Sequence, residues 1–136
     1  MLHLIKLNET QNSTEHNMAT IEMTQATFEQ TIADNDIVII DFWAEWCGPC
    51  KSFAPIFEAA SEKHPDITFA KVNTEVEQQL SAEFGIRSIP TTAVFRDGIG
   101  VFMQPGMLPP QGMEQLIEQV RGLDMAQVKA EMAKQQ

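Results

Sequence analysis

The chain has 136 residues, of which 43% are hydrophobic and 21% are charged, and this composition predicts one soluble globular domain with a buried core. The formal net charge of −10 argues against binding to nucleic acid or to an anionic membrane surface. No apolar run approaches the roughly 18 residues of a membrane-spanning helix, so we expect no membrane partner.

Two cysteines, Cys47 and Cys50, are too few for a scaffold that disulfides hold together. A single C-x-x-C motif between a strand and a helix instead indicates a redox-active, intracellular protein. The first residues, Met1–Lys6, contain one lysine and few apolar residues, and they do not have the pattern of a secretory signal peptide. We therefore expect a cytoplasmic location.

Three segments are predicted along the chain. Residues 1–18 are polar, and we expect them to be disordered. Residues 19–122 should form the folded domain, and residues 123–136 an amphipathic helical extension that Asp124 caps. The extension carries a narrow apolar stripe made of Met125, Val128 and Met132. This stripe fits a helix that packs on the domain or frays in solvent, or else a surface for a partner or a second copy.

The first half of the domain alternates strands and helices. Residues 19–23 are predicted to form a strand, after which Thr24 caps a helix. Residues 37–43 are apolar on both faces, which is typical of a central strand covered by helices on both sides, and Asp41 is the exception. The helix that follows the cysteines has a regular apolar face made of Phe53, Ile56, Phe57 and Ala60.

Pro55 should kink that helix, because it lacks a backbone donor. Residues 67–72 are predicted to form a third strand. Residues 74–77 have the pattern of a capping box that opens the next helix, and Gly85 should end that helix. Its inward side chains are expected to be Val76, Leu80 and Phe84.

The second half predicts a hairpin and a helix. Residues 91–95 and 99–103 flank the turn sequence Arg96-Asp97-Gly98. A helix should begin near Pro109-Pro110 and end at Gly122, burying one apolar face. The order of elements predicts an α/β fold with one mixed sheet and helices on both faces. Sites in such sheets lie beyond the carboxyl ends of the strands, where the two cysteines stand.

Thiol–disulfide exchange needs an attacking thiolate and a second thiol that releases the intermediate. Cys47 is the predicted attacker, because unpaired N–H groups at the start of a helix favour negative charge and lower the pKa of a thiol. Trp46 should give it apolar cover, and Cys50 should be the more buried, resolving thiol. Gly48 is expected to allow a tight turn, and Pro49 to fit the first helical turn.

A bare C-x-x-C motif is also half of a metal site. Mononuclear zinc needs four ligands, and the one histidine outside the polar prefix is His64. It lies about 21 Å from Cys50 if the helix continues between them. We therefore expect no metal.

Asp41 and the segment Ile89-Pro90-Thr91 are the other candidate site residues. Burial should raise the pKa of Asp41, so that it can take the proton of Cys50 and return it, and Lys71 on the next strand should temper that shift. A structural role for Asp41 stays open. The sequence alone also leaves open whether the bond before Pro90 is cis or trans.

Taken together, these segments resemble the thioredoxin family over about residues 19–121. The matching segments are Asp41-Phe42-Trp43-Ala44-Glu45-Trp46-Cys47-Gly48-Pro49-Cys50-Lys51, Pro55, Ala70-Lys71-Val72, Gly85-Ile86-Arg87, Ile89-Pro90-Thr91, Phe95-Arg96-Asp97-Gly98 and Gly106. The resemblance implies the thioredoxin fold, with a mixed five-stranded sheet flanked by helices on both faces and an extra C-terminal helix here.

The resemblance also implies a function. Pro90 would be cis and pack against the disulfide, and an extended client segment would pair with the backbone beside it, near Trp46, Ile89 and Gly106. The activity would be protein disulfide reduction by a monomer without a bound cofactor. Its partners would be disulfide-containing client proteins and an NADPH-dependent flavoprotein, thioredoxin reductase. A scaffold or chaperone module and an extracytoplasmic oxidase are the competing hypotheses.

Overall fold

The computed structural model describes residues 19–135, so the expected disorder of residues 1–18 lies outside the described residues. Ten helices and strands follow one another in this part of the chain. In order they are β1 (Ile21–Glu22), α2 (Gln25–Asp34), β2 (Ile37–Trp43), α3 (Gly48–Lys63), β3 (Thr68–Asn73), α4 (Gln78–Glu83), β4 (Thr91–Arg96), β5 (Ile99–Pro105), α5 (Pro110–Arg121) and α6 (Met125–Lys134). Between residues 19 and 135, no helix is long and apolar enough to cross a membrane.

The strands form one five-stranded sheet in the order β1-β3-β2-β4-β5. β3 is parallel to both β1 and β2, whereas β4 runs antiparallel to β2 and to β5. The predicted mixed sheet and the predicted bounds of its central strand are confirmed. The carboxyl end of β2 leads directly to the two cysteines, which therefore lie beyond the edge where sites are expected.

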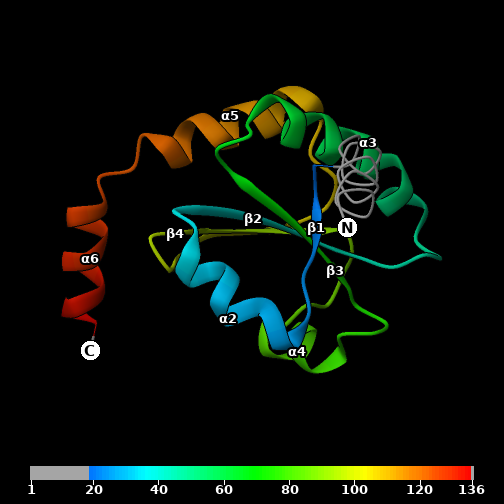
Figure 1. Ribbon diagram of the computed structural model, residues 1–136, viewed down its shortest axis with the longest axis horizontal. Coiled ribbons are helices and arrows are strands. Elements are labelled where there is room, and N and C mark those ends of the chain that lie inside the picture. Colours follow the sequence, from blue (N-terminus) through cyan, green and yellow to red (C-terminus); the bar gives the residue numbers. More distant parts are fainter. Residues whose placement is uncertain (1–18, 136) are drawn as a thin grey trace, which may run out of the picture.

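Helices cover both faces of the sheet, with α3 and α5 on one side and α2 and α4 on the other (Figure 1). Apart from Asp41, β2 is apolar, because alternate side chains enter two different cores. Ile37 and Ile39 pack with α3 and α5, whereas Val38, Ile40 and Phe42 pack with α2 and α4. Asp41 points to the same face as Ile39 and so lies under α3.

The predicted start of α4 was wrong. The hydroxyl and the backbone N–H of Thr74 both donate to the carbonyl oxygen of Trp43, so Thr74 is bonded to the end of β2 instead of capping a helix. The side chain of Asn73 accepts from the N–H of Glu75, and the helix begins four residues later than its expected cap, at Gln78. Val76, expected to face inward, is 70% exposed, whereas Leu80 is buried as predicted.

The hairpin between β4 and β5 turns at Asp97 and Gly98. Both residues have positive φ, 52° and 79°, as a two-residue turn that matches the twist of the strands requires. The predicted hairpin is therefore confirmed. The helix α3 also runs on through Pro55 to Lys63 as one element.

α6 continues beyond α5 and lies beside the hairpin end of the sheet (Figure 1). Asp124 caps it by accepting from the N–H of Gln127, as predicted. Met125 is buried, and Lys129 forms an ion pair of 3.7 Å with Asp97 in the turn. The first turn of α6 is therefore packed on the domain, and the later part of its apolar stripe is more exposed.

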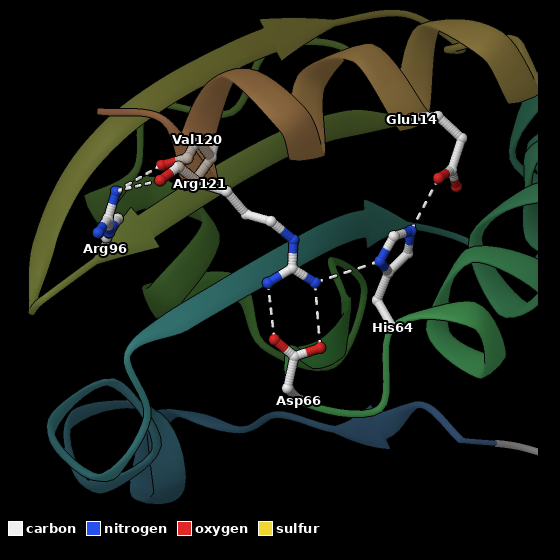
Figure 2. Close-up of polar contacts among 6 residues, drawn as sticks. All are labelled: His64, Asp66, Arg96, Glu114, Val120 and Arg121. Atoms are coloured by element: carbon white, nitrogen blue, oxygen red, sulfur yellow. Dashed lines mark hydrogen bonds and ion pairs between the residues drawn. The ribbon is translucent and has the colours of Figure 1, made fainter. Parts of the chain in front are cut away.

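Polar side chains join the end of α3 to α5 (Figure 2). Arg121 donates two hydrogen bonds to the carboxylate of Asp66, at 2.7 and 3.0 Å, and this contact lowers the pKa of Asp66 to about 2. Arg121 also donates to Nδ1 of His64, so the other ring nitrogen of His64 carries the proton and donates to Glu114.

Candidate active site

The two cysteines lie at the start of α3 and are joined by a disulfide, with their Cα atoms 5.2 Å apart. Cys47 is the N-cap residue of the helix, and its Sγ accepts a hydrogen bond of 3.2 Å from the backbone N–H of Cys50. This bond fits the prediction that the first sulfur lies where helix N–H groups favour negative charge.

Burial does not distinguish the two cysteine residues in the oxidised protein. Cys47 and Cys50 are each 3% exposed, so the expectation that Cys50 is the more buried was wrong for this state. Both pack against Ala44, with Trp43 and Ile89 at the edge of the cluster. Trp43 was missed in the search for site residues, because an aromatic side chain at the end of a buried strand is an ordinary core residue.

Gly48 and Pro49 occupy the first two positions of α3, as the capping rules favour for proline. The explanation expected for Gly48 was wrong. Its φ is not positive, and a Cβ atom there would meet nothing within 4 Å, so the turn itself does not require glycine. Glycine instead leaves the surface beside the sulfurs without a side chain.

The peptide bond between Ile89 and Pro90 is cis, and it lies beside the disulfide. The carbonyl oxygen of Ile89 is 3.6 Å from the Sγ of Cys47. The carbonyl oxygen of Pro90 accepts a bond of 2.8 Å from the N–H of Gly106. Gly106 has a φ of 98°, a conformation that side chains disfavour, so glycine is required there. The structure thus brings three of the predicted binding residues together.

Trp46 is 69% exposed next to Cys47, and its indole N–H donates to the carboxylate of Glu75 at 2.7 Å. The two side chains line an open hollow together with Glu45, Asn73 and Val76. Glu75 was not predicted as a site residue. Glu75 follows β3 as Trp46 follows β2, and the carboxyl ends of parallel neighbouring strands lie at the same edge of a sheet. This position could have marked Glu75 as a site residue.

Asp41 is fully buried, and neither oxygen of its carboxyl group has a hydrogen-bond partner among residues 19–135. Burial raises its pKa from 3.8 to about 7, and the positive charge of Lys71 opposes part of this rise. Lys71 is its neighbour in the sheet register, and the Nζ of Lys71 lies 5.1 Å from the ring centroid of Trp43. At neutral pH such a carboxyl group can both accept and return a proton.

The described residues offer no metal site. Within residues 19–135, no group of three or more His, Cys, Asp or Glu side chains is placed to hold a metal ion. His64 is bonded instead to Glu114 and Arg121, at the far end of α3.

Comparison with known families and proteins gives consistent matches. The family model described as thioredoxin matches residues 19–119. A Streptomyces coelicolor protein named "Putative thioredoxin 2" is 50% identical over 118 residues, which cover 87% of this chain and 88% of that protein. Thioredoxin 1 of a Nostoc species is 41% identical over 102 residues, which cover 74% of this chain and 95% of that protein.

The fold matches solved structures as well. A point mutant of a thioredoxin from Halobacterium salinarum superposes with a TM-score of 0.72 at 31% identity, covering 78% of this chain and 95% of that one. The core of the fold is therefore shared, and the remainder of this chain lies outside the superposed part.

Proposed function

Because this chain belongs to the thioredoxin family and is a dithiol–disulfide oxidoreductase with an active-site disulfide between Cys47 and Cys50, we propose that Cys47 attacks the client and Cys50 resolves the intermediate. The observation that carries this assignment is the N-cap position of Cys47, whose sulfur accepts the N–H of Cys50. The same hydrogen bond stabilises the Cys47 thiolate in the reduced protein.

The reaction begins with the reduced protein. The Cys47 thiolate attacks one sulfur of a client disulfide, a mixed disulfide forms, and the other client sulfur leaves as a thiolate that takes up a proton. The Cys50 thiolate then attacks the Sγ of Cys47. The Cys47–Cys50 disulfide forms, and the second client sulfur leaves and is protonated. Two electrons pass from the dithiol to the client disulfide.

Asp41 assists the second step. Cys50 must lose a proton before it attacks, and the carboxylate of Asp41 lies buried on the sheet face that α3 covers. The pKa of about 7 lets Asp41 accept this proton near neutral pH and pass it on to the departing client thiolate. Lys71 keeps part of the Asp41 population ionised by its positive charge.

The client binds as an extended segment beside Ile89 and Pro90. The carbonyl oxygen of Ile89 lies 3.6 Å from the Sγ of Cys47, and the N–H of Gly106 donates to the carbonyl oxygen of Pro90. Backbone pairing of this kind is indifferent to client sequence, so it suits a protein that reduces many clients. The exposed ring of Trp46 supplies apolar contact next to Cys47.

Thioredoxin reductase, an NADPH-dependent flavoprotein, recharges the disulfide in this proposal, and the protein itself carries no bound cofactor. This thioredoxin-family protein acts as a monomer in the cytoplasm.

Residues 19–122 form the redox domain, and residues 123–136 are an extension that the chemistry does not need. Both cysteines of the chain belong to the redox pair, so none is left for a structural disulfide. This supports a reducing compartment, where structural disulfides are rare.

Cys50→Ser tests the division of roles. This variant should accumulate mixed disulfides with lysate proteins on Cys47, and dithiothreitol should release them. The wild type should reduce insulin with NADPH and thioredoxin reductase, and both single cysteine variants should be inactive. Cys47→Ser is the matched control and should capture no client. Capture by Cys47→Ser, with none by Cys50→Ser, would reverse the roles.

A further inference from the structure

Thr92 is a buried polar residue to which the reaction above gives no role. It lies on β4, fully buried, and its hydroxyl oxygen has no hydrogen-bond partner among residues 19–135. Buried hydroxyl groups almost always have a partner, because losing the bonds to water is costly. An unpaired hydroxyl in the centre of a sheet therefore calls for an explanation.

The sheet register places Thr92 directly opposite Asp41. The two residues are Cα partners in the antiparallel pair of β2 and β4. Opposed residues point to the same face, with Cβ atoms about 4.5 to 5.5 Å apart. Both carboxyl oxygens of Asp41 also lack a partner within the described part of the chain. Three buried polar atoms thus lie on neighbouring strands beneath α3.

The other groups around Asp41 do not complete its hydrogen bonding. Lys71, its partner on β3, attracts the carboxylate by charge, but no ion pair joins the two among residues 19–135. On the helix above, Cys50 is held in the disulfide. The side chains that α5 buries on this face are all apolar, namely Met113, Leu116, Ile117 and Val120. The Thr92 hydroxyl is the remaining donor in the sheet register.

We propose that Thr92 is a positioning residue for Asp41, whose ionised carboxylate accepts a hydrogen bond from the Thr92 hydroxyl, either directly after rotation of the side chain or through one water molecule. This proposal rests on the proton-transfer role proposed above for Asp41. A donor to the carboxylate favours its ionised form, which is the form that takes the proton of Cys50. After that transfer the neutral carboxyl group donates to the same hydroxyl oxygen, so the pair stays bonded in both states.

The test uses three variants of Thr92. Thr92→Val keeps the shape and removes the hydroxyl, Thr92→Ser keeps the hydroxyl, and Thr92→Ala gives a second hydroxyl-free variant should the valine fail to fold. The pKa of Asp41 is measured by carbon NMR of its carboxyl group in the oxidised protein, where the cysteines do not titrate. Removing the hydroxyl should raise this pKa by about one pH unit, and serine should leave it near the wild-type value.

A second readout separates positioning from structure. The pH profile of insulin reduction should shift upward by a similar amount in Thr92→Val, and Thr92→Val should cause no shift in an Asp41→Asn background. An unchanged pKa of Asp41 in the hydroxyl-free variants would overturn the proposal. So would a pKa of Asp41 in Thr92→Ser that is as high as in Thr92→Val. A pH profile that Thr92→Val still shifts in the Asp41→Asn background would overturn it as well. The NMR titration needs no client, so it remains decisive even if the wild type fails to reduce insulin, a result that would overturn only the proposed function.

Discussion

At the scale of single residues, the burial of Asp41 affects both its proposed role in proton transfer and the stability of the fold. Burial disfavours the ionised form of its carboxyl group, and this raises the pKa of Asp41 to about 7. The folded protein therefore holds a proton that the unfolded chain releases at lower pH. Between those two pKa values, rising pH favours the unfolded chain.

Asp41→Asn should remove this pH dependence. In the wild type the contribution of Asp41 to stability falls as pH rises from about 3.8, the ordinary value, to about 7, and then stays constant. The variant should thus gain stability relative to the wild type across this range, by on the order of 4 kcal/mol at pH 8. Urea unfolding of the oxidised proteins at pH 4 and pH 8 measures the difference.

Asp36→Asn is the matched control, because Asp36 is an exposed acid just before the same strand. It should change stability little at either pH. An Asp41→Asn difference that is the same at pH 4 and pH 8 would show that Asp41 is not a buried acid of raised pKa.

Sequence patterns identify Asp41 but not its neighbour Thr92. Asp41 is conspicuous because the rest of β2 is apolar, so a single polar residue marks the site. Thr92 is not conspicuous, because threonine is common in β-strands. Its place opposite Asp41 depends on the register between β2 and β4. The register pairs residues that are distant in the chain, so it cannot be predicted from the local pattern of apolar residues.

At the scale of elements, the ends of helices decide which segments hold together. α5 ends against the hairpin strand β4, where the Nη1 of Arg96 donates to the carbonyl oxygens of Val120, Arg121 and Leu123 at 2.7, 3.1 and 3.0 Å. Figure 2 shows the first two of these bonds. The last carbonyl groups of a helix lack partners within it, and a positive charge there also complements the helix dipole.

Arg96→Met should weaken this attachment. Methionine keeps a long apolar side chain but cannot donate, so three carbonyl oxygens lose the Arg96 donor, and the one of Val120 keeps only backbone donors. We expect a loss of about 2 kcal/mol in the free energy of unfolding. Urea unfolding of the full chain measures the loss, and insulin reduction should be retained. The exposed Arg87 supplies a control, since Arg87→Met should cost much less. Equal losses in the two variants would contradict the capping role of Arg96.

Local sequence signals are reliable for some elements and not for others. The cap residues Thr24 and Asp124 and the Asp97-Gly98 turn were predicted correctly, because each depends on side chains close in the chain. The start of α4 was not, because Thr74 bonds to Trp43 on a different strand. A tertiary hydrogen bond there overrides a local capping pattern.

At the scale of the whole molecule, two layers of helices cover the two faces of the sheet (Figure 1). The disulfide packs with Ile89, the residue before the cis bond, and Trp46 is exposed next to Cys47. The overall architecture and the reactive pair were predictable from sequence. The equal burial of the two cysteines was not, since it depends on contacts between distant segments. The sequence left several roles open for the C-terminal helix, and the buried Met125 agrees with the one in which it packs on the domain.

The most direct test of the account is a redox titration of the full chain in glutathione or dithiothreitol buffers, with the thiols counted by alkylation and mass spectrometry. We predict one reversible two-electron transition in which Cys47 and Cys50 change together, with a reduction potential below about −220 mV, as the proposed role of an electron donor requires. A pair that does not cycle, or a potential near the roughly −120 mV of strongly oxidising dithiol proteins, would contradict the electron-carrier function.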